Sequence, residues 1–136
     1  EFPAFEVFPT TPWNYGLVVD PKNPDVYLTL GNLYGKQGNF TEAIKSYEQA
    51  IQVDSSNLYA HSNLAYVYEE MGDMAKAIET FIKATEVDPD DPVAWYDLGA
   101  AYVRQGDRKK AIECYERSHR LDSKVYKVCL SLALAY

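Results

Sequence analysis

The stretch PVAWYDLGAAYVRQGDRKKAIECYERSHRLDSKV, residues 92–125, recurs along the chain in altered form and decides the fold. Tyr102 within it returns 34 residues earlier as Tyr68, then as Tyr34, and 34 residues later as Tyr136. Because several independent columns share this step, the chain is built from internal repeats. The other columns are Leu30, Leu64, Leu98 and Leu132; Gly38, Gly72 and Gly106; Ala43, Ala77 and Ala111; and Ile44, Ile78 and Ile112.

Each unit runs from Trp or Tyr to Leu-Gly or Leu-Ala, then to Tyr, Gly, Ala and an aromatic residue, and closes on Val-Asp or Leu-Asp. This pattern, from Pro24 to Tyr136, resembles the tetratricopeptide repeat (TPR) family. The resemblance implies an all-α fold, a right-handed α-solenoid of helix-turn-helix pairs that displays a groove for other proteins. We therefore expect repeats at 24–57, 58–91 and 92–125, with an irregular segment at 1–23 and a first helix at 126–136.

The two ends of the chain fit the repeats poorly. Residues 1–15 contain Pro3, Pro9 and Pro12, which exclude a regular helix, yet they are rich in aromatic residues. We expect a cap over the first repeat, and the alternative is a built-in ligand lying in a groove. Residues 16–23 match the last helical turn of a repeat. Residues 126–136 predict a capping helix or the first helix of a truncated fourth repeat, as in a chain cut from a longer array.

Composition excludes several classes of function. The net charge of −7 and the pI near 4.7 argue against nucleic-acid binding, which needs clustered Lys and Arg. The two cysteines, Cys114 and Cys129, are too few for a disulfide scaffold and favour a reducing compartment. The longest apolar run is shorter than the ~20 residues of a membrane span. These features predict a cytoplasmic protein.

Local signals define the helices inside each unit. Asn23-Pro24 and Asp91-Pro92 predict helix starts, and Asn57 caps the second unit without proline. Gly38, Gly72 and Gly106 are expected to end the first helix of each pair, because glycine accepts the left-handed backbone of a helix stop. Columns of small residues mark the places where two helices approach closely, and aromatic side chains fill the space beside them. These columns are Gly31, Ala65, Gly99 and Ala133; Ala43, Ala77 and Ala111; and Tyr47, Phe81 and Tyr115.

No catalytic, cofactor or metal constellation is present in the sequence. His61 occupies a packing column and His119 is 58 residues away, without a Cys or carboxylate cluster to complete a ligand set. The glycines fit helix stops and helix contacts, and no phosphate-binding loop or nucleophile motif occurs. The sequence therefore predicts a protein that is not an enzyme and holds no cofactor or metal.

In the TPR family the first helix of each pair lines the concave groove. The positions expected to face it lie between the packing columns, and tyrosine and asparagine there suit peptide contacts and backbone hydrogen bonds. An alternative for the tyrosines is that they only pack against neighbouring helices. The candidate groove residues are Leu28, Asn32, Tyr59, Asn63, Tyr66, Glu70, Tyr96, Asp97 and Arg104.

The TPR subfamily that binds chaperone C-terminal tails holds the carboxylate with lysines, asparagines and an arginine. Asn32 and Asn63 match the asparagines, but Leu28 and Val93 replace the lysines and Asp97 stands at the arginine position. Chaperone tails are therefore disfavoured, and Asp97, Glu69 and Glu70 suit a peptide with Lys or Arg beside apolar anchors.

The predicted function is a non-catalytic scaffold that binds a peptide segment of a partner protein in the concave groove. The alternative is a homo-oligomeric scaffold that self-assembles through its N-terminal segment or its unpaired C-terminal helix.

Overall fold

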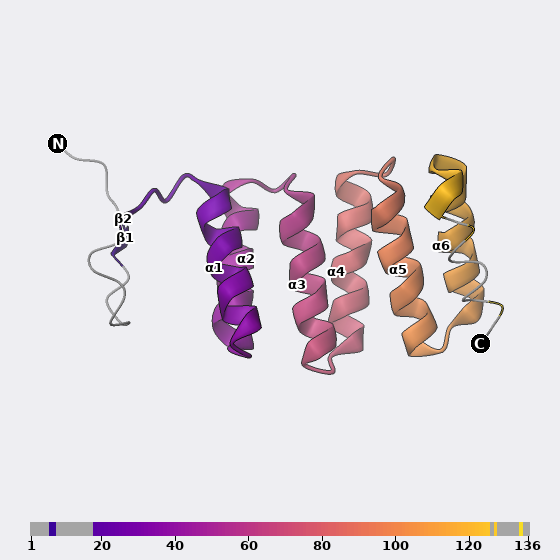
Figure 1. The fold of residues 1–136 in the computed structure, drawn as a ribbon, viewed down its shortest axis with the longest axis horizontal. Coiled ribbons are helices and arrows are strands. Elements are labelled where there is room, and N and C mark those ends of the chain that lie inside the picture. Colours follow the sequence, from indigo (N-terminus) through magenta and orange to yellow (C-terminus); the bar gives the residue numbers. More distant parts are fainter. Residues whose placement is uncertain (1–5, 8–17, 126, 128–133, 135–136) are drawn as a thin grey trace. The chain divides into compact units, whose positions relative to one another are not determined.

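The computed structural model describes residues 6–7, 18–125, 127 and 134. The chain divides into two compact units, Glu1–Ser55 and Ser56–Tyr136. The first unit contains β1 (Glu6–Val7), β2 (Val18–Val19), α1 (Pro24–Lys36) and α2 (Phe40–Val53) (Figure 1). The second contains α3 (Leu58–Glu70), α4 (Met74–Val87), α5 (Pro92–Gln105) and α6 (Arg108–Leu121). The prediction of an all-α fold is confirmed, apart from the two short strands.

The helix starts lie where the sequence predicts them. The side chains of Asn23, Asn57 and Asp91 accept hydrogen bonds from the backbone amides two or three residues ahead, at 3.0, 3.2 and 3.1 Å. Pro24 and Pro92 occupy the first turns of α1 and α5. These caps satisfy amide groups that otherwise have no partner inside the helix.

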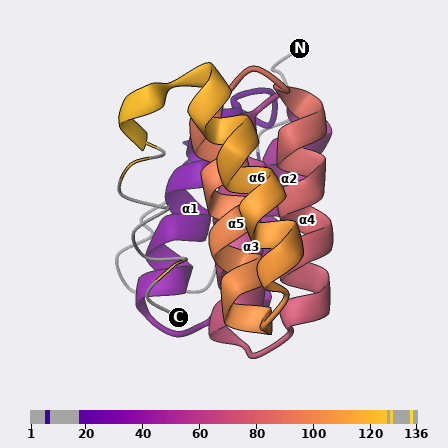
Figure 2. The same cartoon turned by 90° about the vertical axis from the view of Figure 1, so that its right-hand side faces the viewer.

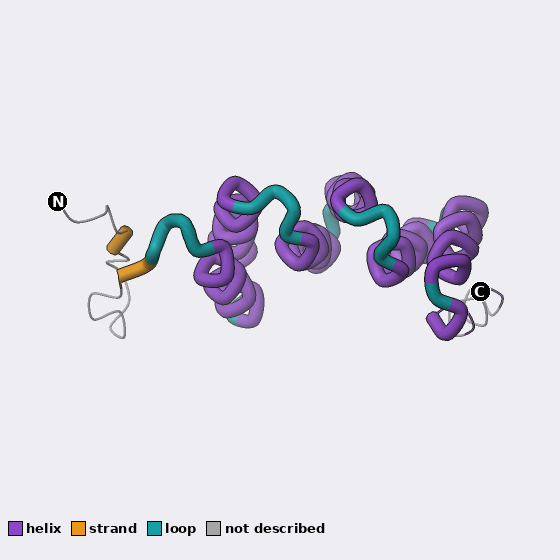
Figure 3. Tube along the Cα trace, turned by 90° about the horizontal axis from the view of Figure 1, so that it is seen from above, coloured by secondary structure: helices purple, strands orange, loops and turns teal. Residues whose placement is uncertain are grey.

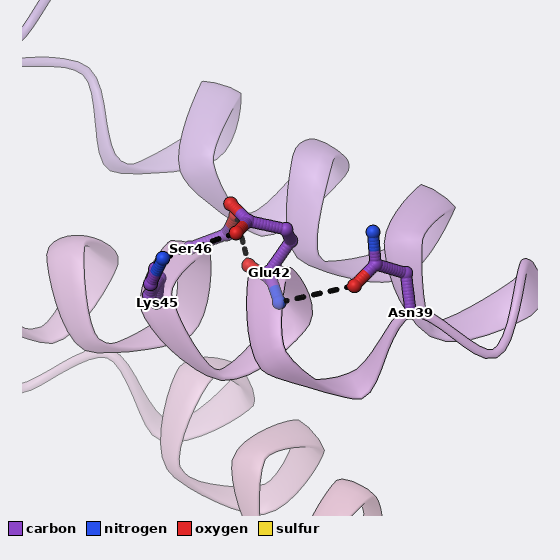
Figure 4. A network of polar contacts seen from close by, with 4 residues as sticks. All are labelled: Asn39, Glu42, Lys45 and Ser46. Atoms are coloured by element: carbon purple, nitrogen blue, oxygen red, sulfur yellow. Dashed lines mark hydrogen bonds and ion pairs between the residues drawn. The ribbon is translucent and has the colours of Figure 1, made fainter.

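The turn inside each pair also follows the sequence signals. Gly38, Gly72 and Gly106 have φ of +74°, +83° and +93°, which an L side chain rarely adopts. An Asn or Asp then caps the second helix. At the start of α2, the Asn39 side chain accepts from the Glu42 amide at 3.4 Å, and the Ser46 hydroxyl donates to the Glu42 carbonyl at 2.8 Å (Figure 4).

Within each pair the two helices approach where the sequence places glycine. A Cβ built on Gly31 of α1 would lie 2.5 Å from the Tyr47 ring of α2, and one on Gly99 of α5 would lie 2.6 Å from the Tyr115 ring of α6. Both distances are too short for a carbon contact. The predicted steric role of these two glycines is therefore confirmed.

The second unit has a continuous core. Phe81 is fully buried and belongs to one cluster with the small residues Ala65, Ala77 and Ala101, and Leu98 of the same cluster is 3% exposed. The helix α4 packs against both α3 and α5, and α5 packs against α6 (Figure 2). Seen from above, α4 is set back from the line joining α3 and α5 (Figure 3). This arrangement leaves one face of α3 and one face of α5 outside the core.

The N-terminal end of the described chain contains a short strand pair. Glu6 and Val7 pair antiparallel with Val19 and Val18, so residues 18–19 form a strand. The prediction that residues 16–23 form a helical turn is therefore wrong for residues 18–19, because their backbone pairs with β1 instead of closing a helical turn. The predicted cap at 1–15 lies mostly outside the described residues, as does most of the predicted helix at 126–136. Residues 123–125, 127 and 134 are helical.

Candidate functional site

The candidate residues of the second unit fall on matching stripes of α3 and α5. Tyr59, Asn63, Tyr66 and Glu70 follow the spacing i, i+4, i+7 and i+11 on α3, and Val93, Asp97, Ala100 and Arg104 repeat it on α5. Residues at this spacing share one side of a helix. Buried Ala60, Leu64 and Val67 occupy another side of α3. We call the two stripes, with Glu69 and Tyr96 beside them, the α3–α5 face.

One end of the α3–α5 face is apolar and open to solvent. Tyr59 is 75% exposed and Val93 is 52% exposed, and they hold equivalent positions in the first turns of their helices. Tyr66, two turns further along α3 from Tyr59, is 39% exposed. Large exposed apolar side chains that gather on one surface are typical of binding sites.

The two inner tyrosines also have structural contacts. The Tyr66 ring meets the buried Phe81 ring edge-on, with centroids 5.2 Å apart. The Tyr96 ring lies against Tyr115 of α6 with centroids 5.9 Å apart. The alternative that these tyrosines pack against neighbouring helices therefore holds in part for Tyr66 and Tyr96. No described contact of this kind involves the Tyr59 ring.

Asp97 is the buried acid of this face. It is only 8% exposed, and the Tyr66 hydroxyl donates a hydrogen bond to its carboxylate. Burial raises the pKa of Asp97, and the nearby carboxylate of Asp91 acts in the same direction, while the Tyr66 hydrogen bond lowers it. Burial and Asp97 together raise the pKa of Tyr66, so its hydroxyl keeps its proton and donates.

An ion pair crosses from α3 to α5 at the other end of the face. The Arg104 guanidinium donates two hydrogen bonds to the Glu69 carboxylate, each 2.9 Å long. The Glu69 side chain is 12% exposed and that of Arg104 is 46% exposed. Arg104 was predicted to face the groove and Glu69 to attract a basic ligand, but each neutralises the other. Glu70 is exposed.

The spacing of the repeats carries a signal for the Glu69–Arg104 pair. Glu69 and Arg104 are 35 residues apart, which is one repeat plus one residue. Opposite charges at this spacing come from adjacent first helices, so the pair could have been found by comparing neighbouring repeats.

The two candidates of the first unit lie on α1. Leu28 is partly buried, and Asn32 is exposed. The Asn32 side-chain oxygen accepts a 2.6 Å hydrogen bond from the Tyr47 hydroxyl of α2. Part of the amide of this candidate groove residue is therefore used inside the helix pair.

Cys114 of α6 is a buried thiol of the second unit. Burial raises the pKa of the Cys114 thiol to about 11, so this thiol is protonated at neutral pH and is a weak nucleophile. The described residues contain no group of three or more His, Cys, Asp or Glu placed to hold a metal ion. In the same part of the chain, no helix has the length and apolar character needed to span a membrane.

Three models of the tetratricopeptide repeat match the chain. A "TPR repeat" model matches residues 36–72, and two "Tetratricopeptide repeat" models match residues 56–124 and 13–45. The model that matches residues 56–124 covers half of the chain. No curated protein matches significantly.

Solved structures show the same fold. The Sgt2 TPR domain from Aspergillus fumigatus is 30% identical with a TM-score of 0.72, over 82% of this chain and 77% of that one. The first TPR of Spaghetti (RPAP3), bound to the HSP90 peptide SRMEEVD, is 28% identical with a TM-score of 0.72, over 87% of this chain and 100% of that one.

A third similar structure, of MamA protein, is 26% identical with a TM-score of 0.65, over 74% of this chain. The chain spans 55% of the length of that MamA structure. The helix pairs, the caps, the glycine contacts and the matched models agree with one another. The chain belongs to the tetratricopeptide repeat family.

Proposed function

We propose that the protein is a non-catalytic interaction module that binds a peptide segment of a partner protein on the α3–α5 face. The observation that carries this proposal is the exposure of Tyr59 and Val93 at equivalent positions of α3 and α5. Neither side chain is needed in the core, whose apolar residues lie on other sides of these helices. Exposed aromatic and aliphatic side chains in this arrangement offer contact area at a low entropic cost.

The partner differs from the peptide in the similar RPAP3 structure. That peptide, SRMEEVD, carries two glutamates and an aspartate. Here Asp97 and Glu70 lie on the corresponding candidate face, and Arg104, its cation, is bound by Glu69. An acidic or carboxylate-ended peptide would meet like charges on the α3–α5 face. We therefore propose a partner segment without a cluster of acidic residues.

The test replaces Tyr59 and Val93, because both side chains are exposed and their removal leaves the core intact. A library of peptides with blocked termini would be screened for binding to the wild type and to the double variant Tyr59→Ser/Val93→Ser. We expect the double variant to bind selected peptides at least about tenfold more weakly, which corresponds to about 1.4 kcal/mol. Its melting temperature should change little, because both side chains are exposed.

Ile112→Ser is the matched control, since Ile112 is 39% exposed but lies on α6. It should bind the selected peptides as the wild type does. If the double variant also binds them normally, the α3–α5 face is not the site. A double variant at Asn63 and Tyr66 of the same face would be a less clean test. Replacing Tyr66 also removes its contact with Phe81 and its hydrogen bond to Asp97.

A further inference from the structure

We propose that the α3–α5 face selects peptides with a basic side chain, lysine or arginine, which binds Asp97 beside an apolar residue on Tyr59 and Val93. This inference rests on the proposed function and names the chemistry of its ligand.

The fold does not require a carboxylate at position 97. The equivalent positions of the other described repeats hold Thr29 and Asn63, which are neutral. Asp97 is 8% exposed, and a buried carboxylate is less favourable than a neutral amide of the same shape unless a cation compensates it. Asp97 therefore carries a charge whose described hydrogen-bond partner is the neutral Tyr66 hydroxyl, and a basic side chain would compensate that charge.

The charges around Asp97 leave it without a dedicated cation in the described structure. Asp91 and Glu69 act on it as like charges. Arg104 is the cation that acts on Asp97, and its guanidinium makes a bidentate pair with Glu69 at 2.9 Å. With Glu70 also on the α3–α5 face, the acids outnumber the cation on this face. A basic side chain from a ligand complements this charge, and an acidic one opposes it.

The spacing on α5 indicates where the apolar neighbour of the basic residue should be. Val93 precedes Asp97 by four residues, which is a rise of about 6 Å along the helix. In an extended peptide, side chains two residues apart point the same way and are separated by about 6.6 Å. An apolar residue two positions from the Lys or Arg would therefore contact Val93 and Tyr59 while the cation reaches Asp97.

The probes are blocked peptides on a Gly/Ser background that carry Leu-Ser-Lys, and matched peptides in which Lys is replaced by Arg, Gln or acetyl-lysine. Binding would be measured by fluorescence polarisation at low and moderate salt. For the wild type we expect the Lys and Arg peptides to bind about tenfold more tightly than the neutral ones, with the preference decreasing as salt rises.

The variant that tests the assignment is Asp97→Asn, which keeps the shape and can still accept the Tyr66 hydrogen bond. It should fold at least as well as the wild type and bind the charged and neutral peptides equally. Glu86→Gln is the control, because it removes one negative charge at an exposed position of α4. It should retain the preference for Lys and Arg.

The outcomes separate this inference from the proposed function. If the wild type binds the Lys and Gln peptides equally, or if Asp97→Asn keeps the preference, the role of Asp97 is refuted while the α3–α5 face remains a site. If none of the Leu-Ser-Lys, Arg, Gln or acetyl-lysine peptides binds while peptides from the library do, this inference is refuted and the proposed function stands; if no library peptide binds either, both are refuted. If the Arg peptide alone is preferred, the inference narrows to guanidinium recognition.

Discussion

The helix pairs α1–α2 and α5–α6 share a close glycine–tyrosine contact but differ in their outward faces. In both, a glycine of the first helix lies against a tyrosine ring of the second, Gly31 against Tyr47 and Gly99 against Tyr115. On the outward stripe, α1 has Thr29 and Asn32 where α5 has Asp97 and Ala100. Asn32 bonds to its own pair, whereas Asp97 bonds to Tyr66 of the preceding pair.

This difference separates the residues that build a repeat from the candidate binding residues. The interior positions are restricted by close contacts, which tolerate few changes of volume. The outward stripe carries different polar groups in different repeats, as Thr29, Asn63 and Asp97 show. Candidate binding residues are therefore found where equivalent positions of the repeats differ.

The largest expected effect comes from the leucine column. Leu98→Ala should lower the free energy of unfolding by about 2–5 kcal/mol, because Leu98 is 3% exposed and its loss leaves a cavity. Leu30→Ala at the equivalent position of α1 should cost less, since Leu30 is only partly buried. Urea denaturation of both variants tests this order. Equal losses would show that the two pairs are packed equally well at this position.

The glycine contacts should have the next largest effect. Gly31→Ala and Gly99→Ala should each destabilise the protein by about 1–3 kcal/mol, because the new methyl group overlaps a buried tyrosine ring. Gly35→Ala is the control, since a Cβ there meets nothing within 4 Å and alanine favours a helix. Thermal unfolding should show a loss for the first two variants and no loss for the third. A stable Gly99→Ala variant would mean that Tyr115 moves aside easily.

The helices and their limits were largely predictable from the sequence because their causes are local. Helix caps such as Asn57 and helix stops such as Gly106 depend on a few neighbouring residues. The 34-residue period indicates which positions lie in the interior of each pair. The strand at Val18–Val19 was not predictable in this way. Its pairing with Glu6–Val7 joins residues that are distant in sequence and that carry no repeat signal.

The candidate face was only partly predictable. The stripe with Tyr59 and Tyr66 on α3 and the stripe with Asp97 on α5 both follow from helical spacing, so their locations could be inferred. The contacts made there could not, because they depend on how side chains from different helices orient. The hydrogen bond from Tyr66 to Asp97 and the pair of Arg104 with Glu69 changed which charges are available to a ligand.

The cross-helix ion pair should contribute a smaller, measurable amount. A double-mutant cycle with Glu69→Gln and Arg104→Gln should give a coupling energy of about 0.5–1 kcal/mol, reduced by solvent screening because Arg104 is 46% exposed. The Glu42–Lys45 pair of α2 is the comparison, with side chains 42% and 63% exposed, and should couple more weakly. Equal coupling in the two cycles would show that the bidentate geometry adds nothing.

The smallest effect concerns pH. Because burial raises the pKa of Asp97 in the folded state, the folded protein holds more protons than the unfolded chain between the unfolded value of about 3.8 and the folded value. The stability contributed by this group is therefore present below pH 3.8 and is lost as the pH rises through the folded pKa. Tyr66, Asp91, Arg104 and Glu69 are the titratable groups that act on it.

Asp97→Asn removes this titration while keeping a hydrogen-bond acceptor for Tyr66. The stability of the variant relative to the wild type should therefore increase as the pH is raised from about 4 to 7, measured by melting temperature at each pH. Glu86→Gln, at an exposed position of α4, should show no such trend. A constant difference between Asp97→Asn and the wild type would mean that the folded protein does not disfavour the Asp97 charge. In that case the carboxylate would already be compensated within the α3–α5 face, and a basic ligand would gain little from reaching it.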